Sequence, residues 1–267
     1  MAIGDQAYAT LSCERHDPHV LIVRFDRQSA ANALNTEMAR DVLALFTAIN
    51  LDADGLRCIV LTGAGDRHFC AGGDLKERDG MSDAAWLTQH TLFEHAFYAI
   101  MDCPVPVIAA VNGAAYGGGC EFALSCDFIY AAEEARFRLP EVTIGIIPGG
   151  GGTQTLTRAV GAARAKEIVL AARPFDAAQA AEWGLVNRVL PRAELLDAAL
   201  ATARAIADAA PVSVRQAKLA IVRGGEVDRR TGLIIEIAAY NQTVTTQDRR
   251  EGVRAALERR KPVFTGQ

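Results

Sequence analysis

Residues 106–127 read "PVIAAVNGAAYGGGCEFALSCD", an apolar run typical of a strand that passes through three glycines into an apolar run typical of a helix. Glycine inside such an element costs about 0.5 to 1 kcal/mol relative to alanine. Gly117, Gly118 and Gly119 in a row, two residues before Glu121, therefore indicate a place where the backbone comes close to a ligand, approaches another segment or makes a tight turn.

Strand and helix patterns alternate around this stretch. Apolar runs closed by turn-type residues predict strands at His19–Asp26 and Leu56–Gly63. Val105–Gly113 has the same character, and a further strand is expected within Cys126–Phe137. Between the first two, Thr36–Asn50 carries apolar residues at helical spacing. This alternation predicts an α/β core with buried strands.

Beyond about Leu190 the helical pattern continues without a strand signal. We therefore expect a core of residues 1–195 that carries the active site, followed by a helical oligomerisation region over residues 196–267. Residues 211–267 contain eleven Lys and Arg against six Asp and Glu, whereas the whole chain has a net charge of −4. Such a basic tail is either a solvated helical surface or a site for an anionic ligand.

Composition limits the class of protein. The chain has 267 residues, half of them hydrophobic, enough for one large core. Its start lacks a signal-peptide pattern and no apolar run is long enough to cross a bilayer, so a cytoplasmic protein is expected. The six cysteines show no C-x-x-C pair, which favours buried reduced thiols over a metal site or disulfides.

Two further glycine-rich stretches accompany the first, at residues 69–77 ("FCAGGDLKE") and 147–154 ("IPGGGGTQ"). Neither Gly117–Gly119 nor the stretch at 147–154 has the lysine of a phosphate-binding P-loop or the spacing of a dinucleotide fingerprint. Backbone amides from two such loops could instead converge on one oxygen, with a helix N-terminus behind them, as an oxyanion hole. The alternative is that each stretch is an ordinary tight turn.

Two carboxylates stand beside these glycines. Glu121 precedes "FALSC" and is expected on the inner face of a helix, and Glu141 follows Pro140 in "FRLPEV". A surface or salt-bridge role is the usual one for an isolated glutamate. Two carboxylates facing one pocket would suit general acid and base work on a carbonyl substrate.

Taken in order, "FCAGGDLKE", residues 106–127, "FRLPEVTIGIIPGGGGTQTLTRAVG" and the ending "EGVRAALERRKPVF" resemble the crotonase superfamily, and enoyl-CoA hydratases in particular. The resemblance covers nearly the whole chain. It implies a crotonase-like spiral of β-β-α turns with a C-terminal all-helical trimerisation region. It also implies a coenzyme A thioester as substrate and an oxyanion hole formed by the amides of Gly73 and Gly118.

The resemblance further implies that Glu121 and Glu141 are both catalytic. They would hold one water; one carboxylate accepts its proton, and Glu141 delivers a proton to the α-carbon. Gly149 would help to place the water. The remaining substrate and coenzyme contacts implied are Ala31, Ala71, Asp74, Leu75, Arg259 and Lys261.

The resemblance implies no metal and no cofactor besides the coenzyme A of the substrate, a role in fatty acid β-oxidation, and a homotrimer or a homohexamer made of two trimers. Basic residues near the C-terminus would contact coenzyme A phosphates, within the chain or across subunits. Gln28 stands where the family commonly has a proline after the arginine. Neither a membrane nor a nucleic acid is expected as a partner.

Other readings remain open. A crotonase-like isomerase, or a hydratase of a branched or dicarboxylic acyl-CoA, is the alternative among enzymes, and "DLKERDGM" resembles the methylglutaconyl-CoA hydratase branch. An RNA-binding protein that uses its basic C-terminal helices is the alternative from another class. Helical spacing favours a core position over an acyl pocket for Trp86, Leu87, Phe93 and Phe97. His68, His90 and His95 are expected at the surface or hydrogen bonded, because no ligand spacing supports a metal.

Overall fold

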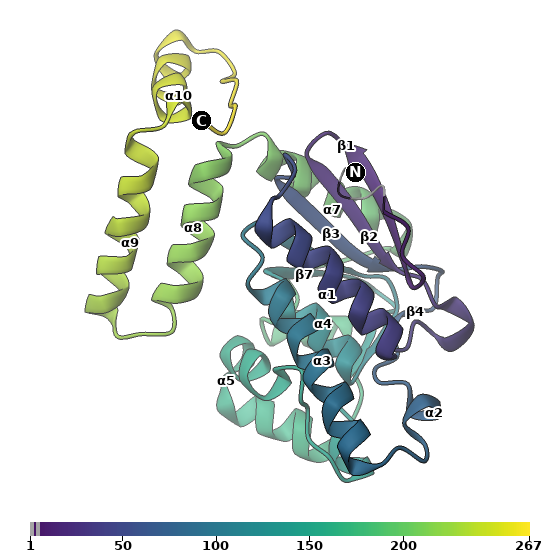
Figure 1. Ribbon diagram of the computed structural model, residues 1–267. Helices are drawn as coiled ribbons and strands as arrows, with labels where there is room; N and C mark the ends of the chain where they lie inside the picture. Colours follow the sequence, from purple (N-terminus) through teal and green to yellow (C-terminus); the bar gives the residue numbers. More distant parts are fainter. Residues whose placement is uncertain (1–2, 4–5) are drawn as a thin grey trace.

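The computed structural model describes residue 3 and residues 6–267, and it contains two sheets and ten α-helices within that part of the chain (Figure 1). In spatial order, the larger sheet consists of β1 (Leu11–Asp17), β2 (Val20–Phe25), β3 (Cys58–Gly63), β5 (Val107–Val111), β7 (Phe128–Ala132) and β10 (Arg188–Leu190). The smaller sheet consists of β4 (His68–Cys70), β6 (Ala114–Tyr116), β8 (Arg136–Arg138) and β9 (Phe175–Asp176).

The helices lie between and after these strands. They are α1 (Thr36–Leu51), α2 (Leu75–Arg78), α3 (Asp83–Met101), α4 (Gly118–Ser125), α5 (Gly152–Ala171), α6 (Ala177–Glu182), α7 (Arg192–Ala207), α8 (Pro211–Gly224), α9 (Arg229–Val244) and α10 (Gln247–Glu258). Short 3₁₀ turns occur at η1 (Gln28–Ala30) and η2 (Glu141–Ile144).

The chain advances as a spiral in which each turn adds one strand to each sheet. β3 leads to β4, β5 to β6 and β7 to β8, and a helix follows each pair. Because every turn runs the same way, β3, β5 and β7 are parallel, and so are β4, β6 and β8. Among the described strands, the pairs β1–β2 and β8–β9 are antiparallel. The crotonase-like fold class is therefore confirmed.

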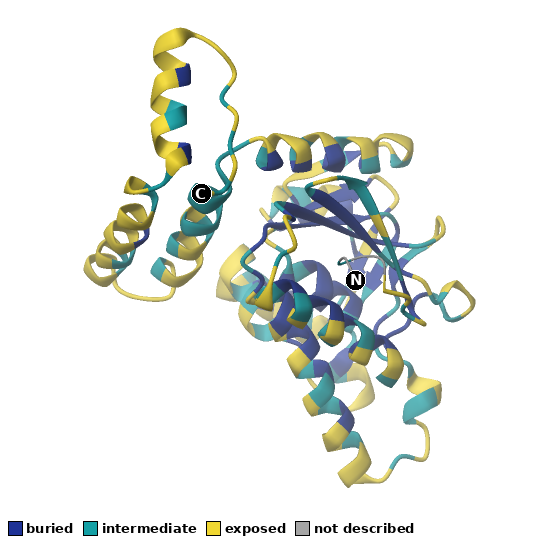
Figure 2. Cartoon of the chain, turned by 45° about the horizontal axis from the view of Figure 1, so that its top comes forward, coloured by how far each residue is buried: buried dark blue, intermediate teal, exposed yellow. Residues whose placement is uncertain are grey.

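The central strands β3 and β5 of the larger sheet are buried along their whole length because both faces of the sheet are covered there. On β2, Leu21 and Val23 belong to the main core, which includes residues of α1, α3 and α4, whereas Val20 and Ile22 pack on the opposite face. Helix α7 covers that opposite face with Leu195 and its neighbours. Figure 2 shows the buried residues concentrated in the sheets and in the helices that pack on them.

The last three helices stand away from this body (Figure 1). Helices α8 and α9 pack on each other as a hairpin, and α8 has no buried residue. The predicted boundary after residue 195 falls inside α7, and α7 packs on the sheet, so the projecting part begins at α8. None of the helices among the described residues is long and apolar enough to cross a membrane.

Candidate functional site

Three loops meet at one edge of the smaller sheet. Gly73 follows β4, Gly118 opens α4 just after β6, and Glu141 follows β8. The carboxyl ends of neighbouring parallel strands lie at the same edge of a sheet, so the spiral brings these positions together although they are far apart in sequence. Sequence reasoning predicted the three residues; the β4–β6–β8 stack explains their meeting.

The loops surround a cavity of about 530 Å³. Both candidate glutamates and both candidate oxyanion glycines lie in its wall. The rest of the wall is mostly apolar. It includes Leu34, Trp86, Leu87, Phe93, Phe97, Ile144, Ile146 and Ile147.

Two backbone amides in this wall, those of Gly73 and Gly118, point to an oxyanion hole. Among the described residues, neither the Gly73 nor the Gly118 nitrogen donates a hydrogen bond. The two loops also touch, because the Gly118 nitrogen lies 3.4 Å from the position that a Cβ atom on Gly72 would occupy. Gly118 is the first residue of α4, whose N-terminus carries partial positive charge. Such a pair of free amides can receive an oxygen that develops negative charge.

The three consecutive glycines are explained in part by crowding. Gly117 has φ +51°, and a Cβ there would lie 2.8 Å from Glu141 Oε1. A Cβ on Gly119 would collide with the carbonyl oxygen of Cys70. A Cβ on Gly118 would meet no described atom closer than 3.6 Å. Within the chain, therefore, Gly117 and Gly119 require glycine, and Gly118 does not.

Glu121 is held by the glycine-rich loop at residues 147–154. Its side chain is buried, and its Oε1 accepts hydrogen bonds from the backbone amides of Gly150 and Gly152, each at 2.8 Å. Burial, helped by the nearby charge of Glu141, raises the pKa of Glu121 from its ordinary 4.5 to about 7 although the two amides act in the other direction. The resemblance assigned Gly149 of this loop to placing the water; in the structure the amides of Gly150 and Gly152 hold Glu121.

Glu141 begins the η2 turn directly after Pro140 and is likewise buried. Its Oε2 atom is buried without a hydrogen-bond partner among the described residues, which is rare for a carboxylate oxygen. Burial raises the pKa of this carboxyl as well. Two carboxyl groups with raised pKa values in one pocket are the arrangement expected of an acid and base pair.

The raised pKa of Glu121 predicts a pH-dependent stability. Below pH 4.5 the carboxyl is protonated in both the folded and the unfolded chain, but between pH 4.5 and about 7 only the unfolded chain loses the proton. The free energy of unfolding therefore falls over this interval, by about 1.4 kcal/mol for each pH unit. Denaturant unfolding of the wild type and of Glu121→Gln at pH 5 and 7.5 should show a larger loss of stability in the wild type than in the variant, which keeps only the contribution of Glu141. Equal pH dependence in both proteins would contradict it.

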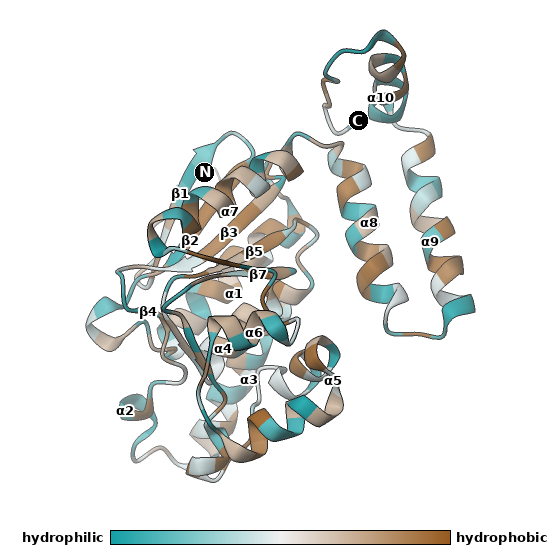
Figure 3. Cartoon of the chain, turned by 180° about the vertical axis from the view of Figure 1, so that it is seen from behind, coloured by the Kyte–Doolittle hydropathy of each residue, from teal (hydrophilic) through white to brown (hydrophobic). Residues whose placement is uncertain are grey.

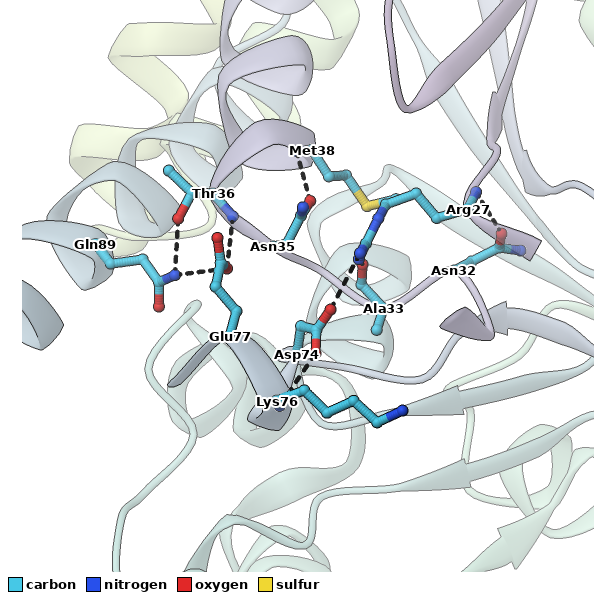
Figure 4. A network of polar contacts seen from close by, with 10 residues as sticks. All are labelled: Arg27, Asn32, Ala33, Asn35, Thr36, Met38, Asp74, Lys76, Glu77 and Gln89. Atoms are coloured by element: carbon cyan, nitrogen blue, oxygen red, sulfur yellow. Dashed lines mark hydrogen bonds and ion pairs between the residues drawn. The ribbon is translucent and has the colours of Figure 1, made fainter. Parts of the chain in front are cut away.

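Some of the predicted substrate contacts lie in the cavity wall and others do not. Ala71, Leu75 and Gly149 lie in the cavity wall. Ala31 lies behind it, where its carbonyl oxygen accepts a hydrogen bond from the Ala71 amide. Asp74 caps α2 and forms an ion pair with Arg27 (Nη2 to Oδ2, 3.1 Å), so its carboxylate already has protein partners (Figure 4).

Arg259 and Lys261 lie far from this cavity within the chain. They follow α10, which stands apart from the body that carries α2 and α3 (Figure 1). Lys261 Nζ is 2.6 Å from Asp208 Oδ2, and both side chains are largely exposed. The neighbouring Arg260 pairs with Glu251 and Glu258. Much of the basic charge at the end of the chain is thus balanced locally, and a coenzyme or RNA contact there stays a prediction.

Several expectations about the wall need correction. The core position favoured for Trp86 and Leu87 is wrong: both line the cavity, and Leu87 is exposed because it faces that opening. Phe93 and Phe97 line the cavity and also belong to the core. Helical spacing alone cannot separate these cases, since a pocket wall and a core have the same period.

His90 also differs from its expected place. It lies in the cavity wall, packed so closely on the next loop that a Cβ on Gly149 would collide with its ring. It makes no hydrogen bond to a described residue. His95 is exposed, as expected. The described residues contain no cluster of three His, Cys, Asp or Glu side chains with metal-binding geometry.

Comparisons with known proteins agree with this geometry. The sequence profile of the family described as enoyl-CoA hydratase/isomerase matches residues 15–267. The crystal structure of an enoyl-CoA hydratase from Bacillus anthracis superposes with a TM-score of 0.94 at 42% identity, covering 97% of this chain and 100% of that one.

Two curated relatives are similar over nearly the whole chain. The short-chain-enoyl-CoA hydratase of Clostridium acetobutylicum is 40% identical over 242 residues, 91% of this chain and 92% of that protein. The mitochondrial methylglutaconyl-CoA hydratase of Mus musculus is 40% identical over 258 residues, 95% of this chain and 82% of that protein.

The spiral fold and the pocket define an enzyme of the crotonase superfamily, whose members act on acyl-CoA thioesters. The chain belongs to the enoyl-CoA hydratase/isomerase family. The resemblance inferred from the sequence is confirmed.

Proposed function

We propose that the protein is an enoyl-CoA hydratase, which adds water across the 2,3 double bond of a 2-enoyl-CoA thioester. The observation that carries this choice over isomerisation is the presence of two buried glutamates in one pocket, Glu121 and Glu141. Moving a double bond needs one group to carry a proton between two carbons. Adding water needs one group to take a proton from the water and one to protonate the α-carbon.

The thioester oxygen lies against the free amides of Gly73 and Gly118, which receive the negative charge that develops on it during addition. The water lies between the two carboxyl groups. Two amides already occupy Oε1 of Glu121, so its other oxygen accepts the water proton as the water oxygen bonds to the β-carbon. Glu141 gives its proton to the α-carbon, and the product is a 3-hydroxyacyl-CoA. Proton transfer between the carboxyl groups, directly or through solvent, restores the enzyme.

The raised pKa values of both glutamates support their working as an acid and base pair. Like charges in a shared pocket disfavour double ionisation, so the pair can hold a single proton near neutral pH. That state has one acid and one base in place. The apolar wall keeps bulk water away from the reacting carbons.

The test is a panel of 2-enoyl-CoA thioesters of different chain length, followed by loss of the conjugated-enoyl absorbance. We expect hydration of at least one short straight-chain member. Conversion of 3-enoyl-CoA to 2-enoyl-CoA, with no hydration of any member, would instead establish the isomerase.

We also propose a homotrimer or a pair of trimers. Helices α8 and α9 carry apolar stretches, coloured brown in Figure 3, and several of their large hydrophobic residues are left exposed by the described part of the chain. They are Leu219, Ile221, Val222, Leu233, Ile234, Ile237 and Tyr240. An apolar surface of this kind is typical of a subunit interface. In such an assembly Arg259 and Lys261 could reach the coenzyme of a neighbouring subunit.

The oligomer is tested by sedimentation velocity at micromolar concentration. The expected mass is three or six times the 28.5 kDa of one chain. A stable monomer would contradict the proposal, because the faces of α8 and α9 would then be in water.

A further inference from the structure

One charged side chain in the cavity wall has no part in the water-addition mechanism. Arg78 ends the short helix α2 and lines the cavity. Its guanidinium carbon lies 4.3 Å from the ring centroid of Trp86 and 5.0 Å from that of Phe93. Its Nε donates a hydrogen bond to Gln89 Oε1 at 2.8 Å. The guanidinium is thus fixed by two aromatic rings and one hydrogen bond.

The group that holds Arg78 is itself fixed. Gln89 is buried, and its Nε2 donates to Thr36 Oγ1 and to Glu77 Oε2, each at 2.8 Å (Figure 4). The Glu77 carboxylate can only accept, so it requires the amide nitrogen on that side. The amide oxygen of Gln89 is therefore directed at Arg78, and the orientation of the guanidinium follows from a complete network.

The positive charge of Arg78 has no anionic partner within 4 Å in the part of the chain that the structure describes. Among the described residues it forms no ion pair, and its terminal nitrogens donate no hydrogen bond. The adjacent Glu77 carboxylate accepts instead from the Thr36 amide and from Gln89. Burial lowers the pKa of Arg78, but an arginine stays charged in proteins. An arginine fork held in a partly buried wall with its outer nitrogens free is suited to bidentate binding of a carboxylate.

We propose that the pocket takes a 2-enoyl-CoA whose acyl chain ends in a carboxylate, and that Arg78 binds that carboxylate. The inference rests on the proposed hydratase function and names its substrate class. Arg78 Nη1 lies 3.6 Å from the position of a Cβ on Gly73. It is therefore within roughly 6 Å of the Gly73 amide nitrogen, since N to Cβ spans about 2.5 Å. The two donors therefore hold parts of the substrate that lie close together, as the thioester and the terminal carboxylate do in a short acyl chain.

Two other roles for Arg78 are separable from this one. If it bound a phosphate of coenzyme A, or only stabilised α2 against α3 through its aromatic contacts, it would affect every acyl-CoA alike. Binding of an acyl carboxylate affects only substrates that have one. The decisive quantity is therefore the ratio of kcat/KM for glutaconyl-CoA, which carries a terminal carboxylate, to kcat/KM for crotonyl-CoA, which does not. Losses common to both substrates cancel in this ratio.

The experiment measures this ratio in the wild type, Arg78→Met and Arg78→Lys. A hydrogen-bonded charge pair contributes about 1.5 to 3 kcal/mol, so the ratio should fall about 10- to 100-fold in Arg78→Met. Arg78→Lys keeps the charge without the fork and should give an intermediate ratio. Lys76→Met is the matched control: it removes a positive charge from the same short helix at an exposed position outside the cavity wall, and should keep the wild-type ratio.

Either of two outcomes would overturn the assignment of Arg78. Hydration of crotonyl-CoA with an unchanged ratio in Arg78→Met overturns the carboxylate assignment and leaves the hydratase function standing. If the wild type hydrates neither crotonyl-CoA nor glutaconyl-CoA, the proposed function is overturned, and the inference with it.

Discussion

Replacing Glu121 or Glu141 by glutamine is expected to lower kcat for hydration by at least about 100-fold in either variant, the lower end for a positioned acid or base. Glutamine keeps the volume of the side chain but can neither accept the water proton nor deliver one to carbon. Both glutamates are buried in the same cavity wall, so each loss should appear in kcat for a short 2-enoyl-CoA. Glu133→Gln, an exposed glutamate outside the cavity, is the control and should retain full activity.

The double variant gives a sharper result. The effects of groups that act as a unit are not additive. The loss of activity in the variant that combines Glu121→Gln with Glu141→Gln should therefore be far smaller than the product of the two single losses. Binding of a coenzyme A thioester should survive in all three proteins, because the free amides are untouched. If Glu121→Gln kept most of its activity while Glu141→Gln lost it, a single-base reaction such as isomerisation would be the better account.

Removing the amide hydrogen of Gly118 is expected to cost about 10² to 10³ in kcat, the usual effect of deleting one oxyanion donor. The variant is Gly118→Pro. Position 118 is the first residue of α4, where proline is well tolerated, and its nitrogen donates to no described residue, so no hydrogen bond of the fold is lost.

Gly118→Ala is the control for the Cβ atom that proline also adds. It keeps the N–H, and the added methyl group would lie 3.6 Å from Leu34 and Phe97, an ordinary contact. We expect the alanine variant to keep most of the activity that the proline variant loses. Equal losses in the two would show that bulk, and not the missing donor, is responsible.

Much of the fold could be predicted from local patterns. The buried runs that became β2, β3 and β5 are long enough to show strand character, and the helical periods of α1 and α7 to α10 are clear. The strands β4, β6 and β8 have three residues each, too few for any pattern. Yet these short strands bring the three site loops together, so the meeting of the loops had to be inferred from a resemblance.

In the candidate site, too, local sequence marked some residues, whereas others matter only through contacts in the folded chain. Glycines and glutamates in unusual local sequence marked Gly73, Gly118, Glu121 and Glu141. Arg78 carried no such mark, because a charged residue at the end of a short helix is normally solvated. Its importance depends on Gln89 and on two aromatic rings of α3, all of which reach it only in the folded chain. The contact of Gly150 with Glu121 is likewise a property of two loops.

The most direct test of the two-carboxylate hydratase is incubation of the wild-type protein with crotonyl-CoA in ¹⁸O-labelled water, followed by mass spectrometry of the thioester. The account predicts a 3-hydroxybutyryl-CoA one labelled water heavier than the substrate, with ¹⁸O in the β-hydroxyl group, and no such product from the double glutamine variant. Recovery of unhydrated thioester, or a hydrated product formed equally well by the double variant, would contradict it.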